Sequence, residues 1–301
     1  MRALITGATG FLGSHLTRKL SSDGHEVHVI VRPNSNLEAL DKLGTAIKCH
    51  VIDAATAPIG IIDAARPEVV FHLATHFVAQ HTSDDVAKLV DSNILFPCQL
   101  VDAMARRGAR RLVNCSSAWQ HYEGADYDPV CLYAATKEAF IKVLQYYIAA
   151  EQFSVVNLTL TDTYGPNDRR AKLFAALYRS VAKNESLAFS PGHQLLDLVY
   201  VDDVVDAFGA AANRLIQNET SRLEDFAIRS GEAISLRELI AKFAAVTGLS
   251  PKIDWGARPY RLREMMNPWE GGRPLPGWQP SIGIEEGIRR MHESHVCNSQ
   301  N

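Results

Sequence analysis

The chain has 301 residues, of which 31 are Lys or Arg and 34 are Asp or Glu, so its formal net charge is −3. Hydrophobic residues make up 47% and charged residues 22%, ordinary values for a globular protein that exclude a disordered or collagen-like chain. Without a basic excess, nucleic-acid binding by bulk charge is not expected. No run of about 18 apolar residues predicts a membrane span, and no secretory segment precedes the first predicted strand.

Short apolar runs alternate with helical patterns over the first 115 residues. Such alternation predicts a parallel sheet covered by helices on both faces, with right-handed crossover connections. The predicted strands are Arg2–Thr6, Glu26–Val31, Ile47–Ile52, Glu68–Leu73 and Arg111–Cys115, and the predicted helices are Phe11–Ser22 and about Ser83–Arg107.

The pattern continues with a helix over Pro129–Glu151 and a sixth strand over Ser154–Leu160. After Gly165 the segments become shorter and mixed, and turn signals become frequent. The sequence therefore predicts an α/β fold with two parts. A Rossmann domain with a doubly wound parallel sheet spans residues 1–165, and a smaller mixed α/β substrate-binding lobe spans 166–301, partly interleaved with the sheet.

The five cysteines are scattered along the chain and form no CxxC pair. This usage favours reduced, buried thiols in a cytoplasmic protein over a disulfide framework or a metal site. The histidines form no HExxH motif, and no metal site is predicted. The cysteines are Cys49, Cys98, Cys115, Cys131 and Cys297.

A glycine-rich loop, TGATGFLG at Thr6–Gly13, follows the first strand and opens a helix. That context separates a dinucleotide-binding fingerprint from a simple tight turn, although the spacing is GxxGxxG. Gly7 permits the turn, Gly10 lets the backbone approach a pyrophosphate, and Gly13 allows close packing of helix on strand. The N–H groups and the dipole of the helix N-terminus attract the phosphates. The loop also brings Thr9, Phe11 and Leu12 to the cofactor.

The residue after the second strand bears on cofactor choice. An NAD-selective site places Asp or Glu there, whereas this chain has Arg32, which suits a 2′-phosphate. We therefore predict NADP(H). If Arg32 is only an exposed loop residue, NAD(H) remains the alternative. Other strand ends supply further cofactor contacts: Asp53 for the adenine amino group, Leu73, Ala74 and Thr75 for the middle of the cofactor, and Cys115.

A YxxxK motif, Tyr133–Lys137, predicts the catalytic acid or base. Its spacing puts both side chains on one helix face, where the lysine is expected to lower the tyrosine pKa from about 10 and to hold the nicotinamide ribose. Ser116 and Ser117 follow the fifth predicted strand, at the sheet edge where ligands bind in such folds. A hydroxyl there can hydrogen-bond the substrate oxygen that Tyr133 protonates. The alternative for both serines is a simple turn.

Together these motifs resemble the extended short-chain dehydrogenase/reductase family, which contains nucleotide-sugar epimerases, dehydratases and reductases. The resemblance implies that Ser117, Tyr133 and Lys137 form a catalytic triad and that the C-terminal lobe holds the nucleoside diphosphate of the substrate. It spans nearly the whole chain and includes HLATH at His72–His76, TYGPND at Thr163–Asp168 and LVYVDDVVDAF at Leu198–Phe208.

Departures from the family pattern restrict which of the family's reactions is expected. Dehydratases follow the catalytic hydroxyl with an Asp-Glu pair, whereas Ala118 and Trp119 stand there, so sugar dehydration is not expected. Leu196 replaces an arginine with which many members bind the diphosphate, which leaves Arg261 as the better candidate. The segments Phe189–Gln194 and Arg258–Arg261 are similar to CDP- and dTDP-linked 4-keto-6-deoxyhexose reductases. The expected substrate-binding residues are His76, Ser117, Asp162, Lys172 and Arg261.

The predicted function is NADPH-dependent reduction of the 4-keto group of a nucleotide-linked 4-keto-6-deoxyhexose, with Tyr133 as the general acid. One alternative is a nucleotide-sugar 4-epimerase that retains NAD(P), and another is a non-catalytic NADP-binding regulator on the same fold. The resemblance also implies a homodimer whose interface uses the helices Ser83–Arg107 and Pro129–Glu151. The alternative is that each subunit buries these helices itself.

Overall fold

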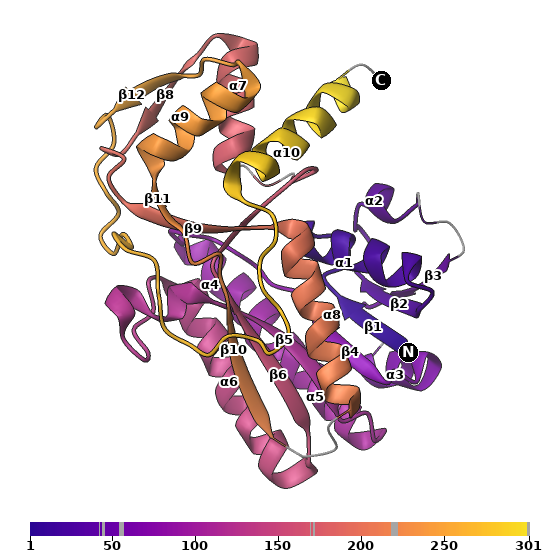
Figure 1. Ribbon diagram of the computed structural model, residues 1–301. Coiled ribbons are helices and arrows are strands. Elements are labelled where there is room, and N and C mark those ends of the chain that lie inside the picture. The colour runs from indigo at the N-terminus through magenta and orange to yellow at the C-terminus, as the bar shows by residue number, and fades with distance from the viewer. Residues whose placement is uncertain are drawn as a thin grey trace.

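The computed structural model describes residues 1–41, 43, 46–53, 57–168, 170, 172–217 and 222–299. Its centre is a seven-stranded sheet in the order β10-β6-β5-β4-β1-β2-β3, in which all neighbouring strands are parallel (Figure 1). The predicted doubly wound Rossmann sheet is confirmed. The strands are β1 (Arg2–Thr6), β2 (Glu26–Val31), β3 (Ile47–Val51), β4 (Val69–His72), β5 (Arg111–Ser117), β6 (Ser154–Leu160) and β10 (Leu223–Ile228).

Helices cover both faces of this sheet, as its continuous apolar strands require. Side chains of α1 (Phe11–Ser22) and α8 (Val201–Gln217) join one core cluster, and those of α3 (Pro58–Ala65), α5 (Phe96–Arg106) and α6 (Leu132–Glu151) join a second. Every residue of β6 is buried, because this strand lies inside the sheet between the two layers. A short helix, α2 (Glu38–Asp41), follows β2.

The strand order reverses beside β1, which lies between β4 and β2. At such a reversal the connections leave to opposite faces, and a crevice opens at the carboxyl ends of the strands. The loop that begins at Gly7 leaves β1 at this point and leads into α1. The sheet topology therefore places the glycine loop, the end of β4 and the end of β5 around one crevice.

The second half of the chain contributes to two regions. It supplies β10 to the central sheet and packs α8 against one face of that sheet. It also builds the lobe in the upper part of Figure 1. Within the lobe, β9 pairs parallel to β7 and antiparallel to β11, while β8 and β12 form a two-stranded parallel sheet. These elements are β7 (Asp162–Tyr164), α7 (Leu173–Lys183), β8 (Ser186–Phe189), β9 (Leu195–Tyr200), β11 (Ala233–Ser235), α9 (Leu236–Thr247), β12 (Lys252–Trp255) and α10 (Ile284–Ser299).

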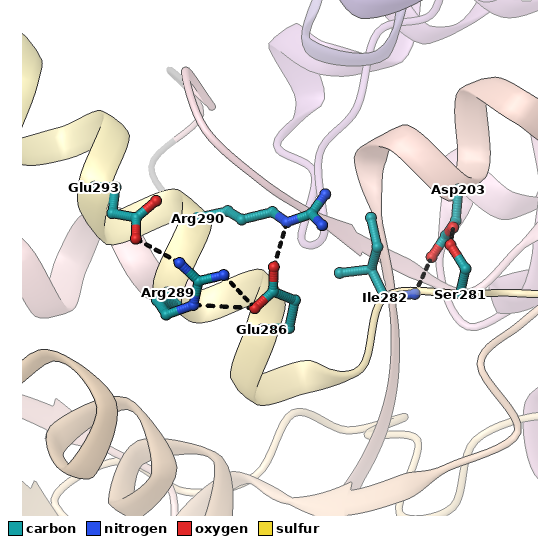
Figure 2. Close-up of polar contacts among 7 residues, drawn as sticks. All are labelled: Asp203, Ser281, Ile282, Glu286, Arg289, Arg290 and Glu293. Atoms are coloured by element: carbon teal, nitrogen blue, oxygen red, sulfur yellow. Dashed lines mark hydrogen bonds and ion pairs between the residues drawn. The ribbon is translucent and has the colours of Figure 1, made fainter.

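Asp203, near the start of α8, binds the C-terminal segment to this helix through hydrogen bonds. Its carboxylate, 3% exposed as a residue, accepts hydrogen bonds from the Ser281 hydroxyl at 2.7 Å and the Ile282 amide at 3.0 Å (Figure 2). The Trp278 indole also donates to the Asp203 carbonyl at 2.8 Å. The ion pairs of α10 that Figure 2 shows lie nearer the solvent, where such pairs contribute little to stability. Asp203 thus gives the LVYVDDVVDAF motif a structural role.

The predicted helix Ser83–Arg107 contains a π-helical turn that the sequence analysis did not anticipate. It consists of α4 (Ser83–Val90), the π segment Asp91–Leu95 and α5. Pro97 explains the wider turn, because it has no N–H to donate and its ring would clash with the carbonyl four residues earlier. The Phe96 amide accordingly bonds the carbonyl of Asp91, five residues back. Such turns frequently occur at functional sites.

Two other expectations need correction. The predicted helix Pro129–Glu151 begins only at Leu132, because the Val130 amide instead pairs with the Trp119 carbonyl at 2.8 Å. All five cysteines are free thiols, but they are not buried as predicted: Cys49 and Cys297 are exposed and the other three are half-buried. Cys49 is exposed because β3 is an edge strand. No helix within the described residues is long and apolar enough to cross a lipid bilayer.

Candidate active site

A cavity of about 1370 Å³ opens at the carboxyl ends of the central strands. This exceeds the roughly 300–1,000 Å³ of a site for one drug-sized ligand, and it suits a dinucleotide together with a second molecule. All but one of the predicted cofactor, catalytic and substrate residues line it. They are Gly7, Thr9, Gly10, Phe11, Leu12, Gly13, Arg32, Asp53, Leu73, Ala74, Thr75, His76, Cys115, Ser117, Tyr133, Lys137, Asp162 and Lys172; Arg261 is the exception.

The glycine loop has the geometry of a dinucleotide cradle. Gly7 has a φ of 72°, and a Cβ there would lie 2.7 Å from the Ala74 amide nitrogen. A Cβ on Gly13 would lie 2.1 Å from the Gly7 carbonyl oxygen, so only glycine lets α1 pack this closely on the loop. Gly10 is the N-cap of α1, and no side chain caps it within the described residues. The loop and helix end thus fit a pyrophosphate.

One end of the cavity lies beside β2 and β3, where the sequence analysis predicts the adenosine of the cofactor. Arg32 directly follows β2, is exposed, and lines the cavity. Ser35 closes the turn, since its hydroxyl accepts from the Arg32 amide and its own amide donates to the Arg32 carbonyl, both at 3.0 Å. Asp53, two residues after β3, lines the same region. A guanidinium therefore stands at the strand end where a 2′-substituent of the ribose would be read.

The structure distinguishes the two serines at the end of β5. The Ser116 hydroxyl donates to the Gln120 side chain at 2.6 Å, and this buried bond gives it a structural role. The Ser117 hydroxyl instead accepts a hydrogen bond from the Trp119 amide at 3.3 Å, inside the cavity. Because this contact uses an oxygen lone pair, the Ser117 proton is left to donate. Ser117 is thus the serine able to bind a substrate carbonyl oxygen.

Tyr133 and Lys137 lie in the first turns of α6 and are 9% and 4% exposed. The Lys137 ammonium donates to the Cys115 carbonyl at 3.0 Å, which fixes it at the end of β5. The expectation that lysine lowers the tyrosine pKa is wrong here. Burial raises the pKa of the Tyr133 phenol above its ordinary value, and burial lowers the pKa of Lys137. The phenol is therefore held in its protonated form.

Asn93, in the π-helical turn, was missed by the sequence analysis. It is 2% exposed, and its Oδ1 accepts from the Thr75 hydroxyl at 3.0 Å and the His76 amide at 2.8 Å. Its Nδ2 donates to the His76 carbonyl at 3.0 Å and the Thr136 hydroxyl at 2.9 Å. Asn93 thereby ties the loop after β4 to the helix that carries Tyr133. Pro97, which predicts a break in the long helix, was the sequence signal for this turn.

The other end of the cavity carries the expected substrate residues. The Lys172 ammonium lies 3.9 Å from an Asp162 carboxylate oxygen, and burial lowers the pKa of this lysine. The Nε2 atom of His76 lies 3.7 Å from a carboxylate oxygen of Asp85. Arg261 does not line the cavity: its guanidinium pairs with Glu264 through bonds of 2.8 and 2.6 Å.

Arg170 is a second residue that the sequence analysis missed. It lines the cavity, and its guanidinium lies 4.5 Å from the centroid of the Phe11 ring, beside the glycine loop. Asp168 holds it through two bonds of 2.7 Å. The TYGPND motif contains Asp168 and was the available signal. Within the described residues, no group of three or more His, Cys, Asp or Glu is arranged to hold a metal ion.

Comparison with known proteins agrees with this geometry. The model of the NAD dependent epimerase/dehydratase family matches residues 3–223. The chain belongs to this family. It is an enzyme of the extended short-chain dehydrogenase/reductase type, as the motifs predicted.

Curated relatives match over almost the whole length. A CDP-abequose synthase of Salmonella muenchen is 25% identical over 293 residues, covering 96% of each chain. A UDP-glucose 4-epimerase of Mycolicibacterium smegmatis is 28% identical over 323 residues, covering all of both. The fold matches a UDP-glucose-4-epimerase from Stenotrophomonas maltophila, solved with NAD and formylated UDP-arabinopyranose. That match has a TM-score of 0.88, 21% identity and coverage of 100% and 99%.

Proposed function

We propose that this enzyme reduces the 4-keto group of a nucleotide-linked 4-keto-6-deoxyhexose with NADPH. The coarser assignment, a nucleotide-sugar-modifying enzyme with an NAD(P) cofactor, is supported by relatives that include both CDP-abequose synthases and UDP-glucose 4-epimerases. Their similar identities do not choose between reduction and epimerisation. The observation that carries the choice is Arg32, which lines the cavity at the end of β2.

Arg32 favours NADP(H) because a guanidinium forms short, charge-assisted hydrogen bonds with a phosphate. An epimerase returns its cofactor to the starting state within each turnover, so it retains one tightly held molecule. A net reduction consumes a reductant each time, and NADPH is selected through its 2′-phosphate. A cation at this position therefore supports a reductase in which the cofactor enters and leaves.

The side chains proposed to contact the sugar C4 oxygen carry the protons that reduction of a carbonyl group requires. The cofactor, when bound, supplies the hydride. Ser117 keeps its proton to donate, because its oxygen already accepts from the Trp119 amide. The buried phenol of Tyr133 is protonated at rest, and it gives its proton to the C4 oxygen as negative charge develops there. Lys137, held by the Cys115 carbonyl, lies one helical turn from Tyr133 and is positioned to bind the nicotinamide ribose.

Dehydration is disfavoured by the same cavity. The residues after Ser117 are Ala118, which is buried, and Trp119, whose side chain cannot exchange a proton with a sugar hydroxyl. The acid and base of a dehydratase are therefore not supplied from these positions. Among the remaining substrate candidates, we propose that Asp162, Lys172 and His76 contact the sugar. Arg261 is bonded to Glu264 outside the cavity lining, so in this arrangement its guanidinium does not reach a substrate there.

The test is oxidation of NADPH, followed by its absorbance, with CDP-, dTDP- and GDP-linked 4-keto-6-deoxyhexoses. We expect one nucleotide form to be reduced with one NADPH consumed per product. NADH serves as the matched control and is expected to react more slowly. No oxidation of either cofactor with any of these sugars would refute the proposal. Product formed without net cofactor turnover would instead establish an epimerase.

We further propose a homodimer that assembles through α4, α5 and α6. These helices carry apolar side chains that remain exposed in one subunit: Val86 at 41%, Val90 at 41% and Tyr146 at 63%. Leu95, in the π turn, is 49% exposed. Light scattering at micromolar concentration is expected to give a dimer, and a monomer would contradict it. The free thiols of all five cysteines suit the cytoplasm, which we propose as its location.

A further inference from the structure

Two aromatic side chains, Phe77 and Trp119, form a wall beside the Tyr133 phenol at the proposed sugar end of the cavity. The Phe77 ring meets the Tyr133 ring edge-on with centroids 4.9 Å apart, and it contacts the Trp119 ring at 5.5 Å. All three side chains line the cavity. Phe77 is 40% exposed although it is large and apolar, so its ring presents open apolar surface in the cavity.

Two cations lie on this wall, but both already have carboxylate partners. The Lys172 ammonium is 5.6 Å from the Phe77 ring centroid and pairs with Asp162 at 3.9 Å. The Arg261 guanidinium is 4.9 Å from the Trp119 ring centroid and is bonded by both oxygens of Glu264. These contacts stiffen the wall. Because each cation is neutralised by its partner, neither offers an uncompensated charge to an acidic sugar.

The apolar surface of the wall limits which substituents of the sugar ring can lie against it. If C4 stands at Tyr133, the flanking carbons C3 and C5 carry the groups nearest the wall. A hydroxyl facing two aromatic rings loses its hydrogen bonds to water without replacement, which is costly. The C3 side of an ordinary hexose carries a hydroxyl, whereas the group on C5 is a methyl, hydroxymethyl or carboxylate. Only the methyl group suits an apolar surface.

We propose that Phe77 and Trp119 select nucleotide sugars whose C6 is a methyl group, and that they reject sugars with a C6 hydroxymethyl or carboxylate group. This inference deepens the proposed function, on which it rests for the placement of C4 at Tyr133. It assigns the 6-deoxy preference to two named side chains. Neither takes part in proton or hydride transfer.

Equilibrium binding tests the assignment without requiring turnover. Isothermal titration of the full-length enzyme with CDP-6-deoxyglucose, CDP-glucose and CDP-glucuronic acid, and with the dTDP-linked set, gives the affinity ratios. We expect the 6-deoxy sugar to bind about 10- to 100-fold more tightly than the other two, the range typical of discrimination by an apolar pocket. Equal affinities, or no binding of the 6-deoxy sugar in either set, would overturn the inference.

Variants distinguish the contribution of the wall to the sugar preference from that of the rest of the cavity. Trp119→Thr is expected to reduce the preference to within about threefold, whereas Trp119→Phe keeps it. The Ser117 contact survives both changes, because it uses the Trp119 backbone amide. Phe77→Ser, at a half-exposed position, provides a second test should Trp119→Thr fold poorly. Trp255→Phe, on the Phe189 and Arg237 side of the C-terminal lobe, is the matched control and is expected to change no ratio.

Different results would refute the proposed reduction and the proposed selection of the sugar. If no 4-ketosugar is reduced while the binding preference and its loss in Trp119→Thr are observed, the proposed reduction is wrong and the wall still selects the sugar. If reduction is observed while Trp119→Thr and Phe77→Ser both keep the full preference, the wall is refuted and the proposed reduction stands.

Discussion

Replacing Asn93 tests whether the π-helical turn positions the catalytic helix. Asn93→Leu keeps a side chain of similar shape and removes four hydrogen bonds, those with Thr75, Thr136 and both backbone groups of His76. Each such bond contributes about 1 kcal/mol net, and buried groups left without a partner cost more. Because Asn93 is 2% exposed, water cannot replace these bonds, and we expect a loss of about 3 to 4 kcal/mol.

The loss converts to a melting shift through the size of the protein. An unfolding entropy of about 2.1 cal/mol/K per residue gives about 0.6 kcal/mol/K for a chain of 301 residues, so Tm should fall by about 5 to 6 °C. Activity should fall more than stability alone explains. Thr75 and His76 line the cavity, and a small displacement of reacting groups costs rate steeply. We expect kcat to drop at least about tenfold while the enzyme remains folded.

The assay combines thermal unfolding with steady-state kinetics on the same preparations. Ser180→Ala is the matched control. Ser180 is 1% exposed, and the substitution removes its hydrogen bonds with the Glu185 carbonyl and the Lys252 amide, which lie outside the cavity lining. It should lower Tm and leave kcat unchanged. An Asn93→Leu enzyme that melts with the wild type refutes the energetic reasoning. One that melts early yet keeps its kcat shows that Asn93 stabilises the fold without positioning the site.

Three further predictions follow from single residues. Tyr133→Phe should lower kcat by about 10²-fold or more, because the proton donor is gone, while NADPH binding measured by fluorescence titration stays within about twofold; residual rapid reduction would contradict this role. Arg32→Glu should shift the ratio of kcat/KM for NADPH over NADH by about tenfold or more toward NADH, and an unchanged ratio would show that Arg32 does not bind the 2′-phosphate. Burial, followed by the charge of Lys137, lowers the pKa of His72 to about 3, below its unfolded value of about 6.5. The stability that neutral His72 provides is therefore present above pH 6.5 and is lost as the pH falls toward 3. Urea unfolding between about pH 6.5 and 5 should show the wild type losing about 2 kcal/mol more than His72→Gln, and equal losses would refute it.

Six of the seven central strands and most of the cavity were predictable because their signals are local, whereas β10 was not predicted. Continuous apolar runs define the strands to within a residue or two of the observed ends, as with Glu68–Leu73 against β4. The glycines of the loop are required by backbone geometry that any packing must satisfy, since side chains on Gly7 or Gly13 would collide with the chain. Strand order then brings the distant motifs to one edge of the sheet.

What the sequence did not reveal depends on contacts between distant segments. The family resemblance chose Ser117 over Ser116, but the physical difference between their identical side chains lies in the contacts with Gln120 and with the Trp119 amide. The direction of the Tyr133 pKa shift depends on how deeply the fold buries it, and the YxxxK spacing does not contain that information. Arg261 lies against the Trp119 ring and outside the cavity lining, paired with Glu264.

The most direct test of the account follows the hydride. The enzyme is incubated with NADPH that carries deuterium at its transferable position and with a CDP- or dTDP-linked 4-keto-6-deoxyhexose, and the product is analysed by mass spectrometry and NMR. We expect one deuterium at C4 of the sugar for each NADPH oxidised, at a rate about 10²-fold or more lower in Tyr133→Phe. Sugar that returns altered at C4 without deuterium and without oxidised cofactor would contradict it.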